Sequence, residues 1–205
     1  MAEVRHENLA TGLRRICLIE SARHERWWLA VDLWDVTMTK KGSKGLRFVV
    51  HEHQATRLHY DFRLEIGGVL KSWAIPKGPS MNPAEKRLAV MVSDHPLLYA
   101  DFEGIIPEGS YGAGPVVVWD EGIFIPVDKD PLQGIQAGKL AFELKGTRLK
   151  GGFVLALMKG RGTGKEWLLM KKKDAHADPK WKLVTALTPQ KLKRLKVRVP
   201  PCDTE

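Results

Sequence analysis

The sequence of 205 residues predicts a mainly β fold, either a sandwich or a barrel. Short apolar or alternating runs recur from residue 47 onward, and glycines and prolines separate them at close intervals, which is typical of all-β domains. The run 58–65 alternates strictly between apolar and polar residues, as a strand with one buried face does. We therefore divide the chain into an N-terminal extension (1–46), a β domain (47–174) and a basic C-terminal tail (175–205).

Eight strands are expected within the β domain. Their ranges are 47–53, 58–65, 69–74, 88–93, 116–119, 139–144, 152–157 and 167–171. Outside the β domain, the extension contains helix-compatible stretches such as 9–22. The tail has room for a short basic helix at 190–196, which Pro200 and Pro201 would end.

Composition narrows the classes of function. The apolar share of 43% and the charged share of 28% are ordinary for a folded soluble protein. The formal charge of +9 favours a polyanionic partner such as DNA, because basic side chains release counterions from phosphates. Two cysteines, Cys17 and Cys202, provide neither a disulfide framework nor a Cys-rich zinc site, which fits the cytoplasm. No stretch approaches the roughly 18 apolar residues of a membrane span, so no membrane partner is expected.

The strand 58–65 has an unusual polar face. Successive side chains of a strand point to opposite faces, so one face carries a core-like set: Leu58, Tyr60, Phe62 and Leu64. The other face carries His59, Asp61, Arg63 and Glu65. An ordinary solvated face remains the alternative interpretation of this pattern. An imidazole, a carboxylate and a guanidinium in a row nevertheless favour a chemical site.

The preceding strand supplies a further ligand. Val49, His51 and His53 share one face there, so two neighbouring strands can bring His53 together with His59 and Asp61. Two imidazoles and one carboxylate form a three-ligand metal site with open positions. A hydrolytic metal needs such positions to polarise a phosphoryl oxygen or to generate hydroxide.

Several cations could surround the same site. Arg63 follows Asp61 on the same strand face, and its planar fork suits phosphate. Lys77 lies in the turn Pro76-Lys77-Gly78-Pro79, Arg87 precedes an apolar strand and His95 follows it. As an imidazolium, His95 could bind the phosphate or protonate the leaving oxygen, with Asp94 orienting it. Each of these residues taken singly is more typical of an exposed surface.

Residues 47–174 resemble the 3′-phosphoesterase domain of bacterial DNA ligase D and its stand-alone bacterial and archaeal relatives. The resemblance rests on ordered stretches: 47–53, Leu58-His59-Tyr60-Asp61-Phe62-Arg63-Leu64-Glu65, Leu70 to Ser80, Lys86 to Val90, Asp94 to Leu97, Tyr99 to Gly104, Ile106 to Gly109, Tyr111 to Gly114, and Trp167 to Leu169 with Lys171. It covers about three-fifths of the chain.

The resemblance implies a closed or nearly closed antiparallel β-barrel that binds the 3′ end of a primer strand. It implies a divalent metal, with manganese favoured, on His53, His59 and Asp61. It also implies catalytic roles for Asp61, Arg63 and His95, and phosphate contacts from a set of five: Arg63, Lys77, Arg87, His95 and Tyr99.

Such domains cleave off a 3′-terminal ribonucleoside and then remove the remaining 3′-phosphate, which leaves a hydroxyl for a polymerase or ligase. The family's N-terminal arm, which contributes to the first step, is not evident in residues 1–46, and Ser93 replaces a common acidic residue. The missing arm favours the phosphomonoesterase step, and Ser93 cannot support the site as a carboxylate would. These 205 residues contain no ligase or polymerase pattern, so we expect such partners, if they act here, to bind in trans.

Two other functions compete with a DNA 3′-end phosphoesterase. The pattern His59-x-Asp61 with a distant His95 also fits a non-haem iron oxygenase. A non-catalytic basic DNA-binding module is the second rival, although it would need interleaved basic and aromatic residues. The glycine-rich stretch 109–114 is better explained as a tight β connection than as a phosphate-binding loop, because no helix is expected after it.

Overall fold

A computed structural model describes residues 45–160 and 162–201 of the chain, so the helix expected at 9–22 lies outside the described residues. The strands within this part are β1 (Leu46–Gln54), β2 (Leu58–Ile66), β3 (Val69–Ile75), β4 (Lys86–His95), β5 (Gly104–Ile106), β6 (Gly114–Pro126), β7 (Lys139–Gly146), β8 (Lys150–Leu157) and β9 (Glu166–Lys171). The helices are the 3-10 helix η2 (Leu97–Asp101) and the α-helices α1 (Pro131–Ala137) and α2 (Pro189–Arg194). No helix among the described residues is long and apolar enough to cross a membrane.

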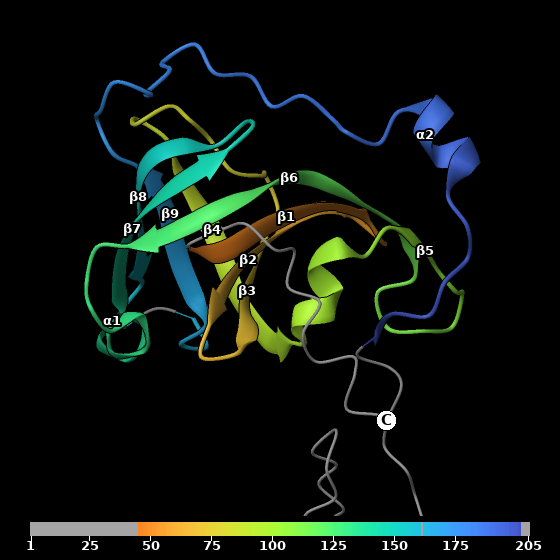
Figure 1. The fold of residues 1–205 in the computed structure, drawn as a ribbon, viewed down its shortest axis with the longest axis horizontal. Coiled ribbons are helices and arrows are strands. Elements are labelled where there is room, and N and C mark those ends of the chain that lie inside the picture. The colour runs from red at the N-terminus through yellow and green to blue at the C-terminus, as the bar shows by residue number, and fades with distance from the viewer. Residues whose placement is uncertain (1–44, 161, 202–205) are drawn as a thin grey trace, which may run out of the picture. The chain divides into compact units, whose positions relative to one another are not determined.

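Eight antiparallel strands close into a barrel. Their order is β1-β2-β3-β4-β9-β8-β7-β6, and β6 pairs back with β1 to complete the ring (Figure 1). The long strand β6 makes closure possible, because its first residues lie between β1 and β5 while its last residues pair with β7. The prediction of a mainly β, closed antiparallel barrel is therefore confirmed.

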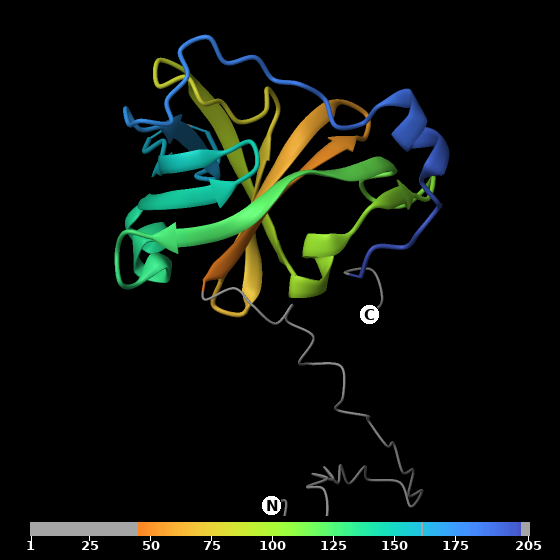
Figure 2. The same cartoon turned by 45° about the horizontal axis from the view of Figure 1, so that its top comes forward.

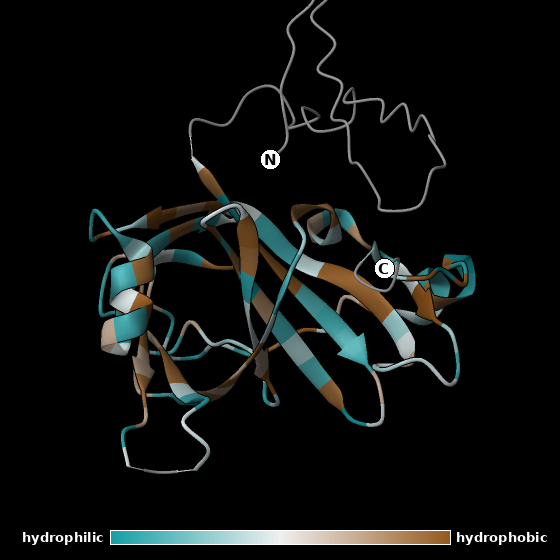
Figure 3. Cartoon of the chain, turned by 90° about the horizontal axis from the view of Figure 1, so that it is seen from below, coloured by the Kyte–Doolittle hydropathy of each residue, from teal (hydrophilic) through white to brown (hydrophobic). Residues whose placement is uncertain are grey.

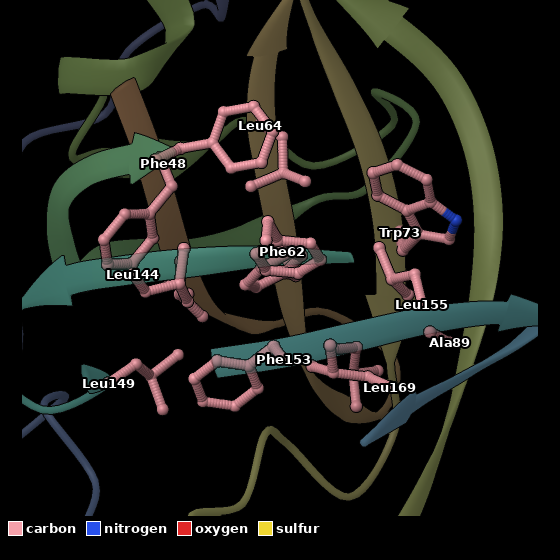
Figure 4. Packing of buried hydrophobic residues seen from close by; sticks show 14 of the residues in the cluster. Phe48, Phe62, Leu64, Trp73, Ala89, Leu144, Leu149, Phe153, Leu155 and Leu169 are labelled. Atoms are coloured by element: carbon pink, nitrogen blue, oxygen red, sulfur yellow. The ribbon is translucent and has the colours of Figure 1, made fainter. Parts of the chain in front are cut away.

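The barrel is filled by aromatic and aliphatic side chains from all parts of the sheet. Figure 4 shows Phe62, Phe153 and Trp73 pointing into this core. Phe142 connects the two sides, with ring centroids 6.0 Å from Phe62 and 6.1 Å from Phe153. Hydrophobic and hydrophilic residues alternate along the strands (Figure 3), as expected when each strand buries one face.

A second, smaller hydrophobic cluster lies on the outside of the barrel. It unites Val49 of β1 and Leu70 of β3 with the segment 99–106, and its buried members are Val49, Leu70, Tyr99, Ala100, Phe102, Ile106 and Val116. Because Phe48 and Val50 belong to the barrel core, Val49 marks the opposite, outer face of β1. The outer face of β1 to β3 is therefore covered by η2 and β5 instead of facing water directly.

The pairing of β1 with β6 shifts register between Val50 and His51, where Val50 is opposite Asp120 but His51 is opposite Val118. An extra residue in one strand is a β-bulge, which bends the strand and re-aims side chains, often next to active sites. This bulge stands at the start of the histidine-bearing half of β1.

All eight expected strands are present, with differences at their ends. The expected strand 116–119 is the centre of the much longer β6, while β5, η2 and α1 were not expected. The short helix expected at 190–196 exists as α2, slightly earlier in the chain. Leu58 is 46% exposed, so it is not part of the core, although alternation along β2 puts it on the same face as Tyr60.

The described part of the tail lies against the barrel and against β5 (Figure 2). The Val184 carbonyl accepts hydrogen bonds from Trp119 Nε1 at 2.7 Å and Arg148 Nη1 at 2.8 Å. Further along, Val197 forms a parallel bridge with Ile105 of β5, and Ile105 N donates to the Lys196 carbonyl at 2.9 Å. We call residues 178–201 the strap.

Glu52 anchors the strap to β1. This carboxylate is buried and accepts hydrogen bonds from the Thr185 hydroxyl and from the backbone amides of Ala186 and Leu187. Replacing Glu52 with alanine should lower the free energy of unfolding by about 3 kcal/mol, because buried donors lose a charged acceptor. Urea denaturation would measure this. Glu143→Ala, which removes an exposed carboxylate from β7, is the control, and equal losses in the two variants would contradict the anchoring role.

Candidate metal centre

Three potential metal ligands converge on the outer face of β1 and β2. The register places His53 directly opposite His59, with their ring centroids 4.7 Å apart. Asp61 lies two residues along β2, with Oδ2 3.5 Å from His53 Nδ1 and Oδ1 3.5 Å from His59 Nε2. All three ligand atoms lie within 4.8 Å of one another. The structure thus brings together the three residues that the sequence predicted as ligands.

Backbone carbonyls orient both imidazoles. His53 Nε2 lies 2.7 Å from the Gly112 carbonyl, and His59 Nδ1 lies 3.0 Å from the Arg57 carbonyl. Each of these nitrogens must carry the proton to donate to a carbonyl, which leaves the other nitrogen with a free lone pair. In both rings that free nitrogen is the one facing Asp61. Such outer hydrogen bonds fix the tautomer of metal-binding histidines, so the donor set fits a divalent metal ion.

Asp61 is held in its charged form by its neighbours. Burial alone would raise the pKa of this carboxyl group, but the adjacent Arg63 guanidinium holds it well below its usual range. Arg63 Nη2 donates to Asp61 Oδ2 at 3.1 Å. The carboxylate therefore offers a permanent negative charge, which is the main attraction for a hard cation.

Arg63 is buried behind the ligands, with a side-chain exposure of 2%. Besides Asp61, it donates to Ser72 Oγ at 2.9 Å and to His51 Nδ1 at 3.4 Å. Its guanidinium carbon lies 4.6 Å from the centroid of the Tyr99 ring. The sequence predicted that the planar guanidinium of Arg63 would bind phosphate directly. In this structure, the guanidinium donates to protein acceptors instead, and its contribution to the site is mainly its positive charge.

His95 and Tyr99 join the cluster from β4 and η2. The two rings lie 4.9 Å apart, and His95 Nδ1 lies 2.9 Å from the Ser93 carbonyl and 3.5 Å from Ser72 Oγ. Burial and the nearby Arg63 lower the pKa of His95 to about 4. The expectation of an imidazolium is therefore corrected for the substrate-free protein, in which His95 is neutral at pH 7. Asp94 is engaged by Lys71 Nζ at 2.5 Å.

His51 and Ser72 are parts of the cluster to which the sequence gave no role. His51 is fully buried, and burial with the Arg63 charge lowers its pKa to about 3. Its Nε2 has no hydrogen-bond partner among the described residues. Alternation with His53 on β1 was the signal that could have identified His51. Ser72 gave no comparable signal, because a serine on a strand is usually a surface residue.

Lys77 and Arg87 have no described contact with the cluster. Lys77 is exposed, two residues past the end of β3, at the barrel end where β2 begins. Arg87 pairs with Glu85 and is opposite Leu169 of the core, so it lies on the inner face of β4. Their phosphate-binding roles stay predictions. The three residues that come together are not the iron-oxygenase triad, because the second histidine of the group is His53, whereas an oxygenase triad was expected to use His95.

Comparison with known proteins decides the family. The family model described as "DNA Ligase D 3'-phosphoesterase domain" matches residues 51–157, which is about half of the chain and contains every predicted site residue. The chain belongs to this family. The match spans β1 to β8, from the histidine-bearing half of the first strand onward. It supports a phosphoesterase, a hydrolase of phosphate esters.

Curated relatives point in the same direction. The multifunctional non-homologous end joining protein LigD of Pseudomonas aeruginosa is 56% identical over 139 residues, which are 67% of this chain. The LigD DNA repair protein of Mycobacterium tuberculosis is 46% identical over 127 residues, or 60% of the chain. The alignments span only 16% of each of these two proteins. The other activities of those proteins therefore say nothing direct about this chain.

Proposed function

We propose that this member of the LigD 3′-phosphoesterase family heals the 3′ ends of DNA with the help of a divalent metal ion, with manganese favoured. The substrates are primer–template ends that carry a 3′-phosphate, and ends with a terminal ribonucleoside that must first be cleaved off. The observation that best supports this proposal is the group of His53, His59 and Asp61, in which the free imidazole nitrogens and the carboxylate face one another. We propose ligase and polymerase partners in trans for the resulting hydroxyl.

We assign separate tasks to the side chains. His53, His59 and Asp61 would hold the ion, which supplies polarisation of a phosphoryl oxygen and a lowered pKa for bound water. Arg63 keeps Asp61 ionised and adds positive charge beneath the phosphate. Neutral His95, with Nδ1–H directed at the Ser93 carbonyl, presents Nε2 as an acceptor. A phosphate dianion arriving beside His95 would raise its pKa, so the residue could become a proton donor once substrate is bound.

The decisive experiment uses a labelled primer–template that ends in a 3′-phosphate. The protein is first treated with a chelator and then given manganese, magnesium or no metal, and the products are resolved on a gel and tested for extension by a polymerase. Metal-dependent conversion to an extendable hydroxyl end is expected. An oxygenase would instead need ferrous iron and a co-substrate, and a DNA-binding module would bind without conversion in every condition.

DNA affinity should depend steeply on salt, with part of that dependence arising from the strap. Lys193, Arg194 and Lys196 are exposed there, whereas Lys171 of β9 is buried and paired with Asp174. Removing residues 175–205 would also remove the Glu52 contacts, so charge substitutions are the cleaner test. Changing all three exposed residues to glutamine should weaken binding to every DNA sequence and reduce the slope of log K against log salt by about 0.9 per lost phosphate contact.

The matched control neutralises three exposed lysines on the far side of the barrel, Lys139, Lys145 and Lys150 of β7 and β8. Strand β8 is four strands from β2 in both directions around the ring. If both triple variants flatten the salt dependence equally, the strap has no special place in DNA binding.

A further inference from the structure

Two loops lie at the edge of the metal centre. The β1–β2 turn supplies the Arg57 carbonyl to His59, and the loop between β5 and β6 supplies the Gly112 carbonyl to His53. The two loops start close together, because a Cβ at Gly114, the first residue of β6, would lie only 2.2 Å from the carbonyl oxygen of Gln54, the last residue of β1. Side chains carried by these two loops therefore lie close to the three ligands.

The β1–β2 turn and the β5–β6 loop expose a cation and an aromatic ring, respectively. Tyr111 is 99% exposed, although it lies directly beside Gly112 in the chain, ~3.8 Å away between Cα atoms. Arg57 is also exposed, and its guanidinium has no hydrogen-bond or ion-pair partner among the described residues. An aromatic ring left wholly in water loses the burial that usually stabilises such side chains. Both groups are thus available to a ligand.

The backbone on both sides of Tyr111 is hydrogen-bonded within its own loop. Ser110 N donates to the Pro107 carbonyl and Ala113 N to the Ser110 carbonyl, both at 3.2 Å. Gly112 adopts a φ of +74°, and a Cβ there would lie 3.2 Å from His53 Cε1. The backbone that presents the ring is therefore packed on a predicted metal ligand, so the position of Tyr111 is tied to that of the metal centre.

We propose that Tyr111 is the stacking platform for the base of the terminal nucleotide, and that Arg57 binds a phosphate of the same strand. The inference rests on the proposed function and adds a nucleoside subsite to it. An aromatic ring accepts any base because every base has a π face, and interleaved cations follow the backbone. Stacking would hold an end of any sequence with its 3′-phosphate at the metal centre, as an end-healing enzyme requires.

The test uses two primer–templates that differ only in the 3′-phosphorylated terminal nucleotide, which carries a base in one and is abasic in the other. Tyr111→Ala should raise KM for the base-bearing end roughly tenfold and bring it to the KM of the abasic end, with kcat little changed. Tyr111→Phe keeps the ring and should keep the preference. Arg57→Gln should raise KM for both ends by one common factor, and Val127→Ala, an exposed apolar residue after β6, should change neither.

A binding measurement without metal separates the two proposals. With 2-aminopurine as the terminal base, the wild-type protein should quench fluorescence in the presence of a chelator and Tyr111→Ala should not. If Tyr111→Ala keeps the wild-type preference for a base and the wild-type quenching, Tyr111 is not the platform. If the wild-type protein releases phosphate from neither end, the proposed function fails, and the quenching alone then decides whether Tyr111 stacks on the base.

Discussion

Replacing Asp61 with asparagine is expected to reduce phosphate release from 3′ ends by at least roughly a hundredfold to a thousandfold, the loss seen when one group that stabilises developing charge is removed. Asp61 is the only carboxylate of the ligand group, and without its charge the site attracts a divalent cation far less. Steady-state release of phosphate, together with manganese binding, measures the effect. Metal binding should weaken in parallel.

Asparagine is preferable to alanine for a structural reason. Asp61 is also the buried partner of Arg63, and removing one member of a buried ion pair costs about 3–5 kcal/mol of stability because a charge is left uncompensated. Asp61→Asn also loses the negative charge, but its amide oxygen can still accept the hydrogen bond from Arg63 Nη2, and thermal unfolding shows whether the variant remains folded. A folded Asp61→Asn protein with wild-type turnover would remove Asp61 from the proposed centre.

Replacing His95 and replacing His59 should have different consequences. His95→Ala is expected to reduce turnover by roughly a hundredfold or more while leaving manganese affinity near the wild-type value, because its described hydrogen-bond partners are Ser93 and Ser72. His59→Ala and His53→Ala should weaken manganese binding itself, since each removes one ligand of the group. Calorimetric titration of manganese and phosphate release would be measured on the same preparations.

His176→Ala provides the control for loss of a histidine, because this exposed residue lies beyond β9 and belongs to no described part of the cluster. It should match the wild-type protein in both measurements. If His95→Ala loses manganese as severely as His59→Ala, His95 belongs to the coordination shell, and the division between metal ligands and phosphate contacts is wrong.

The sequence alone determined the strands and the polar face of β2. Alternation with period two is a local property, because each side chain points away from its neighbour whatever the rest of the chain does. His59, Asp61 and Arg63 could therefore be placed on one face from their spacing in the chain. The spacing of the apolar runs was sufficient to predict an all-β domain, and the resemblance to a family added closure of the barrel.

What the tertiary structure decided depends on contacts between distant segments. The register of β1 against β2 brings His53 opposite His59, and a one-residue shift would have turned the whole ligand face away. Tyr99 of η2 packs against both His95 and Arg63. Burial and the Arg63 charge keep His95 neutral, and neither effect is visible in a linear pattern. Likewise, Glu52 looks like an ordinary charged residue in the sequence. Its hydrogen-bond donors come from the strap, more than a hundred residues later in the chain. Burial and long-range pairing set these properties, because the free energy of a charge depends on everything that surrounds it, whereas strand alternation depends only on the adjacent residues.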